Sequence, residues 1–222
     1  MRLSIVIPVL DEAAVLPGAL RALAPLRARG HEVIVADGGS ADGSAALAAP
    51  LADAVLAAPR GRARQMNAGA AQARGEALVF LHADTRLPEA ADRAIAAALA
   101  GRDWGRFDVR IEGRSPLLAM IGWFMNQRSR LTGIATGDQA IFVRRARFAG
   151  FPEIALMEDV AFSAAMRRAG RPACLRERVL TSGRRWEARG VLRTMLLMWR
   201  LRLAYAFGAH PDDLARRYAG KA

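Results

Sequence analysis

The stretch Ala77-Leu-Val-Phe-Leu-His-Ala-Asp-Thr85 is the main indication of the fold. It is apolar through Leu81 and then becomes polar, which is typical of a buried central strand whose carboxyl end carries a site. In an open α/β sheet, ligands bind at that edge. On a strand, His82 and Asp84 would point to the same face, where an imidazole and a carboxylate are suited to a divalent metal. The alternative is a polar strand end that leads into an ordinary loop.

A βαβ unit is predicted upstream of this stretch. Leu3-Ser-Ile-Val-Ile-Pro-Val9 and residues 32–36 are short β-branched runs suited to parallel strands. Between them, residues 15–28 carry apolar positions at helical spacing, with Pro17 near the start and Gly30 just beyond the end. The first forty residues therefore predict a strand, one helix and a second strand.

The second predicted strand stops at Asp37-Gly-Gly-Ser-Ala-Asp-Gly-Ser44. The glycines allow the backbone to approach a ligand closely, and Asp37 and Asp42 offer acceptors for ribose hydroxyls or a base edge. A Gly-rich turn in which Asp42 or Ser40 caps a helix explains the same residues. Spacing alone does not separate the two interpretations.

A basic segment, Arg60-Gly-Arg-Ala-Arg-Gln-Met-Asn-Ala-Gly69, follows a short predicted strand at residues 54–56. It is expected to enter a helix that runs to about residue 73, so that its arginines lie close to the positive end of that helix. This arrangement suits a diphosphate. Gln65 and Asn67 are candidates for contacting a nucleotide or shaping the loop. The alternative is a solvated basic helix start.

The second half of the chain continues the α/β pattern. Helices are predicted at residues 89–100, 116–125 and 157–170, and strands at 104–111, 140–143 and 173–175. An acidic residue at a helix start, such as Asp159, tends to stay ionised, which suits a proton acceptor and equally suits a helix cap. Arg184, Arg185 and Trp186 form either a ligand-binding group or a surface cation–π pair.

The segment 190–208 is apolar but is interrupted by Arg193, Arg200 and Arg202, which makes it a poor transmembrane helix. It suits a helix packed on the rest of the protein or on a second subunit, or an amphipathic helix on an anionic membrane. We expect packing. The predicted organisation is a catalytic domain at 1–188 and a helical appendage at 189–222.

Composition limits the function classes. The chain has 33 basic and 21 acidic residues and a formal net charge of +12, which fits nucleic acid, an anionic membrane or a phosphate-rich substrate. The only lysine is Lys221, which excludes a Gly-Lys-Ser/Thr phosphate loop and a Schiff-base lysine in the core. Cys174 is alone, which excludes a disulfide framework or a cysteine-rich zinc site. No signal-peptide layout is present at the N-terminus, so a cytoplasmic location is expected.

Four motifs in order carry a family resemblance: Ser4-Ile-Val-Ile-Pro-Val-Leu-Asp-Glu12, Val35-Ala-Asp-Gly-Gly-Ser-Ala-Asp-Gly-Ser44, Gly61-Arg-Ala-Arg-Gln-Met-Asn-Ala-Gly69 and Phe80-Leu-His-Ala-Asp-Thr85. Together they resemble the family 2 glycosyltransferases, and most closely the radical-SAM/selenodomain-associated transferase 2 subfamily, to about Gly208. The resemblance implies a GT-A (nucleotide-diphospho-sugar transferase) fold: a mostly parallel, Rossmann-like central sheet flanked by helices, here with a C-terminal amphipathic helix.

The resemblance also implies roles for individual residues. The metal site of such enzymes falls on His82 and Asp84, and His82 departs from the family's Asp-x-Asp pattern. The general base falls on Asp159, with Glu158 and Arg185 as further catalytic residues. The donor-binding residues are expected to be Pro8, Glu12, Asp37, Gly38, Asp42, Arg62, Gln65, Asn67, Asp84, Gly137, Asp138, Arg184 and Trp186.

The expected function is an inverting glycosyltransferase of the hexosyltransferase class, which uses a nucleotide-diphosphate sugar, an acceptor hydroxyl and Mn2+ or Mg2+. Metal or arginine is needed because the leaving diphosphate gains negative charge. A homodimer and peripheral membrane contact through 190–208 are further expectations. The alternatives are a sugar-phosphate nucleotidyltransferase and a binding module for a membrane surface or nucleic acid. No nucleic-acid partner is expected, because carboxylates at the strand ends repel phosphate unless a metal intervenes.

Overall fold

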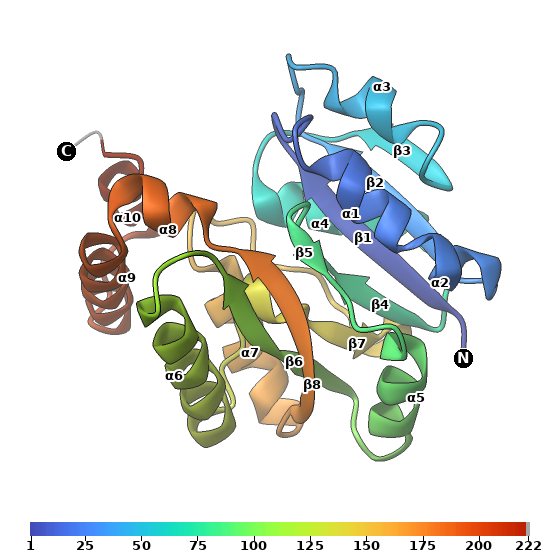
Figure 1. Ribbon diagram of the computed structural model, residues 1–222. Coiled ribbons are helices and arrows are strands. Elements are labelled where there is room, and N and C mark those ends of the chain that lie inside the picture. The colour runs from blue at the N-terminus through green and yellow to red at the C-terminus, as the bar shows by residue number, and fades with distance from the viewer. Residues whose placement is uncertain (221–222) are drawn as a thin grey trace.

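The most apolar runs of the sequence form the centre of a mixed sheet. The computed structural model describes residues 1–220, and within them an eight-stranded sheet has the order β3-β2-β1-β4-β7-β6-β8-β5 (Figure 1). The strands are β1 (Leu3–Val9), β2 (Glu32–Asp37), β3 (Ala54–Ala57), β4 (Ala77–Phe80), β5 (Thr85–Arg86), β6 (Trp104–Glu112), β7 (Phe142–Arg144) and β8 (Ala173–Ser182).

The sheet is parallel in its first half and mixed in its second. β3, β2, β1 and β4 run parallel to one another, as the βαβ pattern predicts. β7 then pairs antiparallel with both β4 and β6. β6 and β8 are parallel, and β5 pairs antiparallel with β8. The carboxyl ends of β1, β2 and β4 therefore lie along one edge of the sheet.

Helices cover both faces of the sheet. They are α1 (Leu16–Ala22), α2 (Ala24–Ala28), α3 (Ser44–Ala48), α4 (Arg62–Gln72), α5 (Ala91–Gly101), α6 (Leu117–Thr132), α7 (Glu158–Ala169), α8 (Arg184–Arg189), α9 (Val191–Ala206) and α10 (Pro211–Tyr218), with single 3-10 turns at Gly137–Gln139 and Arg145–Arg147. The prediction of an α/β fold flanked by helices is confirmed.

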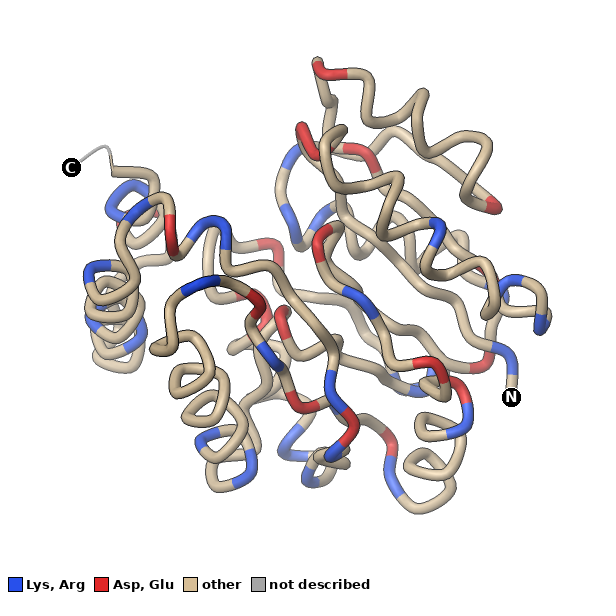
Figure 2. Tube along the Cα trace, in the orientation of Figure 1, with Lys and Arg blue, Asp and Glu red and all other residues tan. Residues whose placement is uncertain are grey.

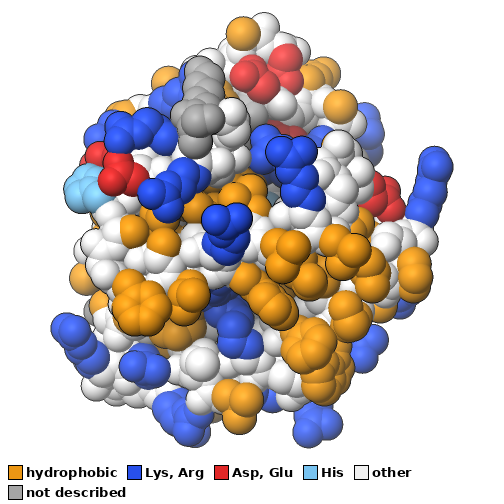
Figure 3. Space-filling view, turned by 90° about the vertical axis from the view of Figure 1, so that its left-hand side faces the viewer, with side chains coloured by type: hydrophobic (Ala, Val, Ile, Leu, Met, Phe, Trp, Pro, Cys, Tyr) orange, Lys and Arg blue, Asp and Glu red, His pale blue; other side chains and the backbone are white. Residues whose placement is uncertain are grey.

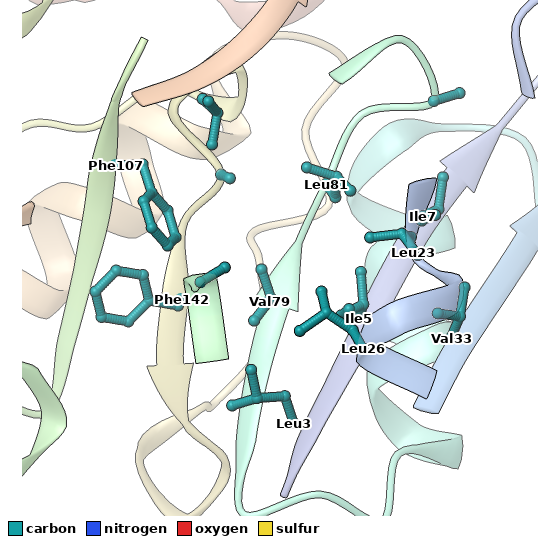
Figure 4. Packing of buried hydrophobic residues seen from close by; sticks show 14 of the residues in the cluster. Leu3, Ile5, Ile7, Leu23, Leu26, Val33, Val79, Leu81, Phe107 and Phe142 are labelled. Carbon is teal, nitrogen blue, oxygen red and sulfur yellow. The ribbon is translucent and has the colours of Figure 1, made fainter. Parts of the chain in front are cut away.

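Two apolar clusters hold these layers together. On one face, Leu3, Ile5 and Ile7 of β1 pack with Leu23 and Leu26 (Figure 4), and α5 and α6 extend the same cluster. On the other face, β4 and β7 pack against α4 and α7. Burial of an aliphatic or aromatic side chain contributes about 1.5–3 kcal/mol, so the two clusters fix the strand ends from which the site is built.

The predicted helix at 15–28 is two helices. Pro25 has no backbone N–H, and the chain turns at Leu23, whose carbonyl accepts from Leu26 and Arg27. The predicted helix at 116–125 is too short, because α6 continues to Thr132.

The predicted strand through His82 is also too long. β4 ends at Phe80, and the backbone N–H of Thr85 bonds the carbonyl of His82 across a turn at 3.0 Å. The strand-alternation argument for His82 and Asp84 is therefore wrong: both residues lie in the turn that follows the strand.

The C-terminal helices pack against the start of α7. Met157, Leu201 and Leu214 form a third buried cluster that joins α9 and α10 to that helix. The described residues of the segment 189–222, which was expected to be a helical appendage, form α9 and α10. Within residues 1–220, no helix combines the length and the apolar character that crossing a bilayer requires. Residues 221–222, the end of the predicted appendage, lie outside the described part of the chain.

Candidate functional site

A cavity of about 450 Å³ lies at the carboxyl ends of β1, β4 and β8. Its lining combines residues from β1 to α10. The predicted site residues that line it are Pro8, Glu12, Arg62, Gln65, His82, Asp84, Gly137, Asp138, Glu158, Asp159, Arg185 and Trp186. Residues far apart in sequence are thus brought to one edge of the sheet, as expected of an α/β ligand site.

Gln65 ties the first two strands together at this edge. Its Nε2 donates to the carbonyl of Val9 at 2.6 Å and to that of Ala36 at 3.0 Å. A Cβ at Gly38 would lie 3.0 Å from the Gln65 side chain, so the backbone there must approach closely. Gln65 therefore shapes the wall of the cavity, and Gly38 leaves the room that it needs.

Asp37 and Asp42 order the loops beside the cavity and do not line it. Asp37 Oδ2 accepts from the backbone N–H of Ser40 at 3.0 Å, and Asp42 Oδ2 accepts from that of Ala13 at 2.8 Å. Both carboxylates therefore order loops, whereas the N-cap residue of the helix α3 is Gly43, and neither Asp42 nor Ser40 occupies that position. Their donor-binding roles stay predictions.

Asn67 lies away from the cavity lining. Its Nδ2 donates to the carbonyl of Phe151 at 2.9 Å, and its Oδ1 accepts from the N–H of the same residue at 2.8 Å. Because both ends of the amide are engaged by one backbone unit, Asn67 joins α4 to the loop before α7. Its position does not support the predicted donor role.

Two arginines of α8 face two carboxylates from the strand ends. Arg185 Nη2 lies 2.7 Å from Glu12 Oε1, and Arg184 also bonds Glu12. Arg184 Nε lies 3.7 Å from Asp84 Oδ2, beyond hydrogen-bonding distance. Arg184 is therefore beside the cavity, next to the residues that line it, and the pair brings positive charge to the carboxyl ends of β1 and β4. Figure 2 shows basic positions repeated along the C-terminal helices.

His82 is held by the loop that contains Gly137–Gln139. Its Nδ1 lies 3.2 Å from Asp138 Oδ1, and its Nε2 is buried without a hydrogen-bond partner in residues 1–220. A Cβ at Gly137 would lie 2.4 Å from that Nε2, so the ring packs directly on the glycine. Burial alone raises the pKa of Asp138, but His82, Arg62 and Arg185 outweigh it and leave that pKa below its ordinary value.

The described residues offer few metal ligands at the cavity. No group of three or more His, Cys, Asp or Glu side chains in residues 1–220 is arranged to hold an ion. Neither nitrogen of His82 is open in this arrangement, whereas the Asp84 carboxylate lines the cavity, with Arg184 Nε 3.7 Å from its Oδ2. Mg2+ usually takes one or two carboxylates and completes its shell with water and phosphate oxygens. The residues therefore fit an ion held by Asp84 together with a substrate diphosphate.

Glu158 and Asp159 open α7 beside the same loop. The backbone N–H of Gly137 donates to Asp159 Oδ2 at 2.8 Å, which fixes the carboxylate at the cavity wall. Glu158 is 3% exposed and lies 3.6 Å from Arg62 Nη1. Burial, together with the neighbouring Asp159 charge, raises the pKa of Glu158.

The wall formed by α9 and α10 was missed by the sequence predictions. It consists of Thr194, Met198 and Arg202 from α9 and Ala215 and Tyr218 from α10. The α9 residues are spaced by four, which places them on one face of a helix. That spacing was visible in the sequence, but Arg202 was interpreted there only as an interruption of an apolar run.

Comparison with known proteins identifies relatives of this chain. The sequence model of the family described as glycosyl transferase family 2 matches residues 4–151. No curated protein matches the chain.

Solved structures resemble the fold. S. aureus TarS 1–349, with and without UDP-GlcNAc, is 19% identical, with TM-scores of 0.66 and 0.63; the match covers 82% of this chain and 58% and 61% of those chains. The present chain thus spans about three fifths of that protein fragment. Mannosyltransferase PcManGT from Pyrobaculum calidifontis, in complex with GDP-Man and Mn2+, is 20% identical over 98% of this chain and 69% of that chain, with a TM-score of 0.63.

A third structure is glucosyl-3-phosphoglycerate synthase from Mycobacterium tuberculosis, in complex with Mn2+, UDP and phosphoglyceric acid. It is 19% identical over 80% of this chain and 68% of that chain, with a TM-score of 0.58. At such identities the likeness concerns the fold, and that fold is the GT-A type of α/β structure.

Proposed function

The chain belongs to glycosyl transferase family 2, and we propose that it transfers a hexosyl group from a nucleotide-diphosphate sugar to an acceptor hydroxyl with inversion. One observation carries the proposal: Asp159 is fixed at the wall of a cavity that also contains Asp84, Glu12 and Arg185. A proton acceptor and cations for a leaving diphosphate thus face one space.

In this reaction Asp159 accepts the proton of the acceptor hydroxyl. The hydroxyl oxygen forms a bond to the anomeric carbon while the bond from that carbon to the diphosphate oxygen breaks. The nucleoside diphosphate leaves with the bonding electron pair, so a single displacement inverts the anomeric centre. Correct placement of one base is worth about 10²–10⁴-fold.

The cations of the site oppose the charge that develops on the diphosphate. Arg184 and Arg185 reach the cavity edge from α8, and Arg62 reaches it from the start of α4. Preorganised donors of this kind stabilise the transition state because they do not need to reorient. When bound, Mn2+ or Mg2+ held by Asp84 would add Lewis-acid charge to the same oxygens. Mn2+ is present in two of the similar structures.

Finer assignments belong to the same proposal. Within the family, the motifs place the chain nearest to the radical-SAM/selenodomain-associated transferase 2 subfamily. Residues 1–188 would form the catalytic domain, and the appendage at 189–222 would complete the cavity through α9 and α10, whose side chains line it.

We also propose that the protein acts at the cytoplasmic face of an anionic membrane. Its exposed large apolar side chains concentrate on two helices, with Met120, Trp123, Phe124 and Leu131 on α6 and Leu192, Leu196, Trp199 and Leu203 on α9, followed by Phe207. Figure 3 shows apolar side chains gathered on this face with basic ones among them. Aromatic and aliphatic groups beside arginine suit the headgroup boundary. The same surface is where a homodimer would form.

A thermal-shift panel of nucleoside diphosphates and their sugars, each with manganese or with chelator, tests the function. One base should raise the melting temperature by about 5–10 °C at a hundred times its dissociation constant. Asp84→Asn should remove the manganese-dependent part of the shift, and Glu177→Gln, an exposed substitution on β8, should not. Absence of a shift with every ligand would contradict a transferase and favour a binding module.

A further inference from the structure

The inner face of α9 forms the wall of the cavity on the side of the C-terminal helices. Thr194, Met198 and Arg202 line the cavity there, together with Tyr218 of α10. The opposite face of α9 is exposed, with Trp199 at 59%. The helix therefore separates the cavity from the apolar outer surface, and Arg202 is directed to the cavity side.

The cations at this wall differ from those at the donor end. Arg62 and Arg185 lie 3.6 Å from Glu158 and 2.7 Å from Glu12, respectively. Within residues 1–220, Arg202 takes part in no ion pair, and Nη2 of the nearby Arg128 is buried without a hydrogen-bond partner. The hydroxyl of Thr194 is likewise buried without a partner there. Polar groups that lack partners are thus concentrated between α6 and α9.

This arrangement is costly without a ligand. Burial and the charge of Arg202 lower the pKa of Arg128 to about 10, and burial lowers the pKa of Arg202 despite the opposing charge of Asp159. Both guanidinium groups still carry a charge at neutral pH. Both arginines are half-buried, and a guanidinium partly removed from water without a close counterion is unfavourable, so an anion that enters would relieve that cost.

We propose that this wall binds an oxyanion of the acceptor, a phosphate or a carboxylate, next to the hydroxyl that Asp159 deprotonates. Arg202 and Thr194 contact the oxyanion from α9, and Arg128 adds positive charge from α6. The inference rests on the proposed function, because it assigns the two ends of one cavity to two substrates. The arginines of α4 and α8 bind the donor diphosphate at the other end.

Isothermal titration with inorganic phosphate and with malonate, at constant ionic strength, tests the wall directly. The wild-type protein should bind one of the two, and Arg202→Gln should weaken that binding by about tenfold or more, because it removes charged hydrogen bonds. Arg202→Lys should retain most of the affinity. The matched control is Arg200→Gln, an exposed position two residues away on α9, which should change affinity by less than about twofold.

The same variants distinguish this wall from the donor site. Arg202→Gln should leave the affinity for nucleoside diphosphates unchanged. Equal phosphate affinity in wild type and Arg202→Gln, or a parallel loss of nucleoside diphosphate binding, would overturn the proposal. Because phosphate binding needs no donor, its failure is separate from failure of the transferase function in the panel above.

A final arm identifies the source of a phosphate. Glycerol 3-phosphate and vesicles that contain phosphatidic acid are compared as ligands of wild type and Arg202→Gln. Arg202-dependent binding of either ligand supports the proposed oxyanion site. The ligand that binds indicates whether the acceptor is a soluble molecule or a lipid. If inorganic phosphate is the anion that binds, absence of Arg202-dependent binding for both of these ligands counts against the proposal.

Discussion

Backbone strain marks the candidate site at the scale of single residues. In residues 1–220, the non-glycine residues with positive φ are Asp11 at 52°, Ala140 at 45° and Met157 at 72°. They follow β1, end the Gly137–Gln139 turn and precede Glu158, respectively. Such conformations cost about 1–3 kcal/mol each and persist where the surroundings determine them. Their positions beside the cavity agree with a site whose loops are held in place.

Asp159→Asn tests the proposed base. The amide retains the size of the carboxylate and can still accept from the Gly137 N–H, but it cannot take the hydroxyl proton. We expect donor affinity within about twofold of wild type and turnover reduced by at least about a hundredfold. Single-turnover transfer and donor titration measure the two quantities. Asp213→Asn on α10 is the control, and undiminished turnover in Asp159→Asn would reassign the base.

Glu158 makes stability depend on pH. Its raised pKa means that the folded state holds this proton more tightly than the unfolded state. The wild-type carboxyl therefore costs no stability below about pH 4.5, and costs progressively more as the pH rises through its folded pKa. In Glu158→Gln this cost is absent, so its melting temperature minus that of wild type should increase from about pH 4.5 to about pH 7.

Melting curves over that pH range, with Glu177→Gln as a control that shows no trend, measure the effect. A difference that decreases with pH would mean that the pairing of Glu158 with Arg62, at 3.6 Å, outweighs its burial.

Residues in local motifs could be predicted, and residues defined by distant partners could not. Asp84, Gly137 and Asp159 lie in short segments with a recognisable pattern, and all three line the cavity. The amide of Asn67 is engaged by Phe151, 84 residues away. Its environment follows from tertiary packing, which no local pattern contains.

At the scale of elements, the ends of helices and strands differ from the predicted ends. Helix and strand types followed from periodicity, but β4 ends at Phe80 because the next backbone groups turn toward Thr85. Pro25, which lies in the first turn of α2, marks the break between α1 and α2 within the predicted helix. The length of α6 was underestimated because residues 126–130 are polar, yet Asn126 and Ser129 of that segment are buried.

The apolar surface of α6 and α9 gives a prediction for membrane contact. Trp123 and Trp199 are 56% and 59% exposed. Replacing both with Ser should reduce binding to phosphatidylglycerol vesicles by about tenfold or more, because each indole loses its contact with the acyl boundary. Co-sedimentation measures binding, and Leu47→Ser, an exposed site on α3, should have little effect.

Sedimentation velocity without lipid measures the oligomeric state and tests whether a second subunit, and not a membrane, covers that surface. A wild-type dimer that the double Trp→Ser variant converts to monomer would show that a second subunit covers these helices.

At the scale of the whole molecule, the fold class followed from the sequence and the sheet order did not. Alternating strands and helices predicted an α/β sheet with a ligand site at its carboxyl edge. The sheet is present, and a cavity lies at that edge. The antiparallel insertion of β7 between β4 and β6 depends on pairing across long sequence separations. Three residues of strand carry too little local signal to specify such a partner.

The lining of the cavity extends along the chain from Pro8 to Tyr218. The chain is synthesised from the N-terminus, and domains generally fold as units. The carboxyl ends of β1 and β4 therefore leave the ribosome well before α9 and α10, which form the other side of the lining. Under the proposed function, a chain that lacks α9 and α10 would lack the wall opposite the donor end, so water rather than an acceptor hydroxyl would be the nucleophile that reaches a bound sugar nucleotide.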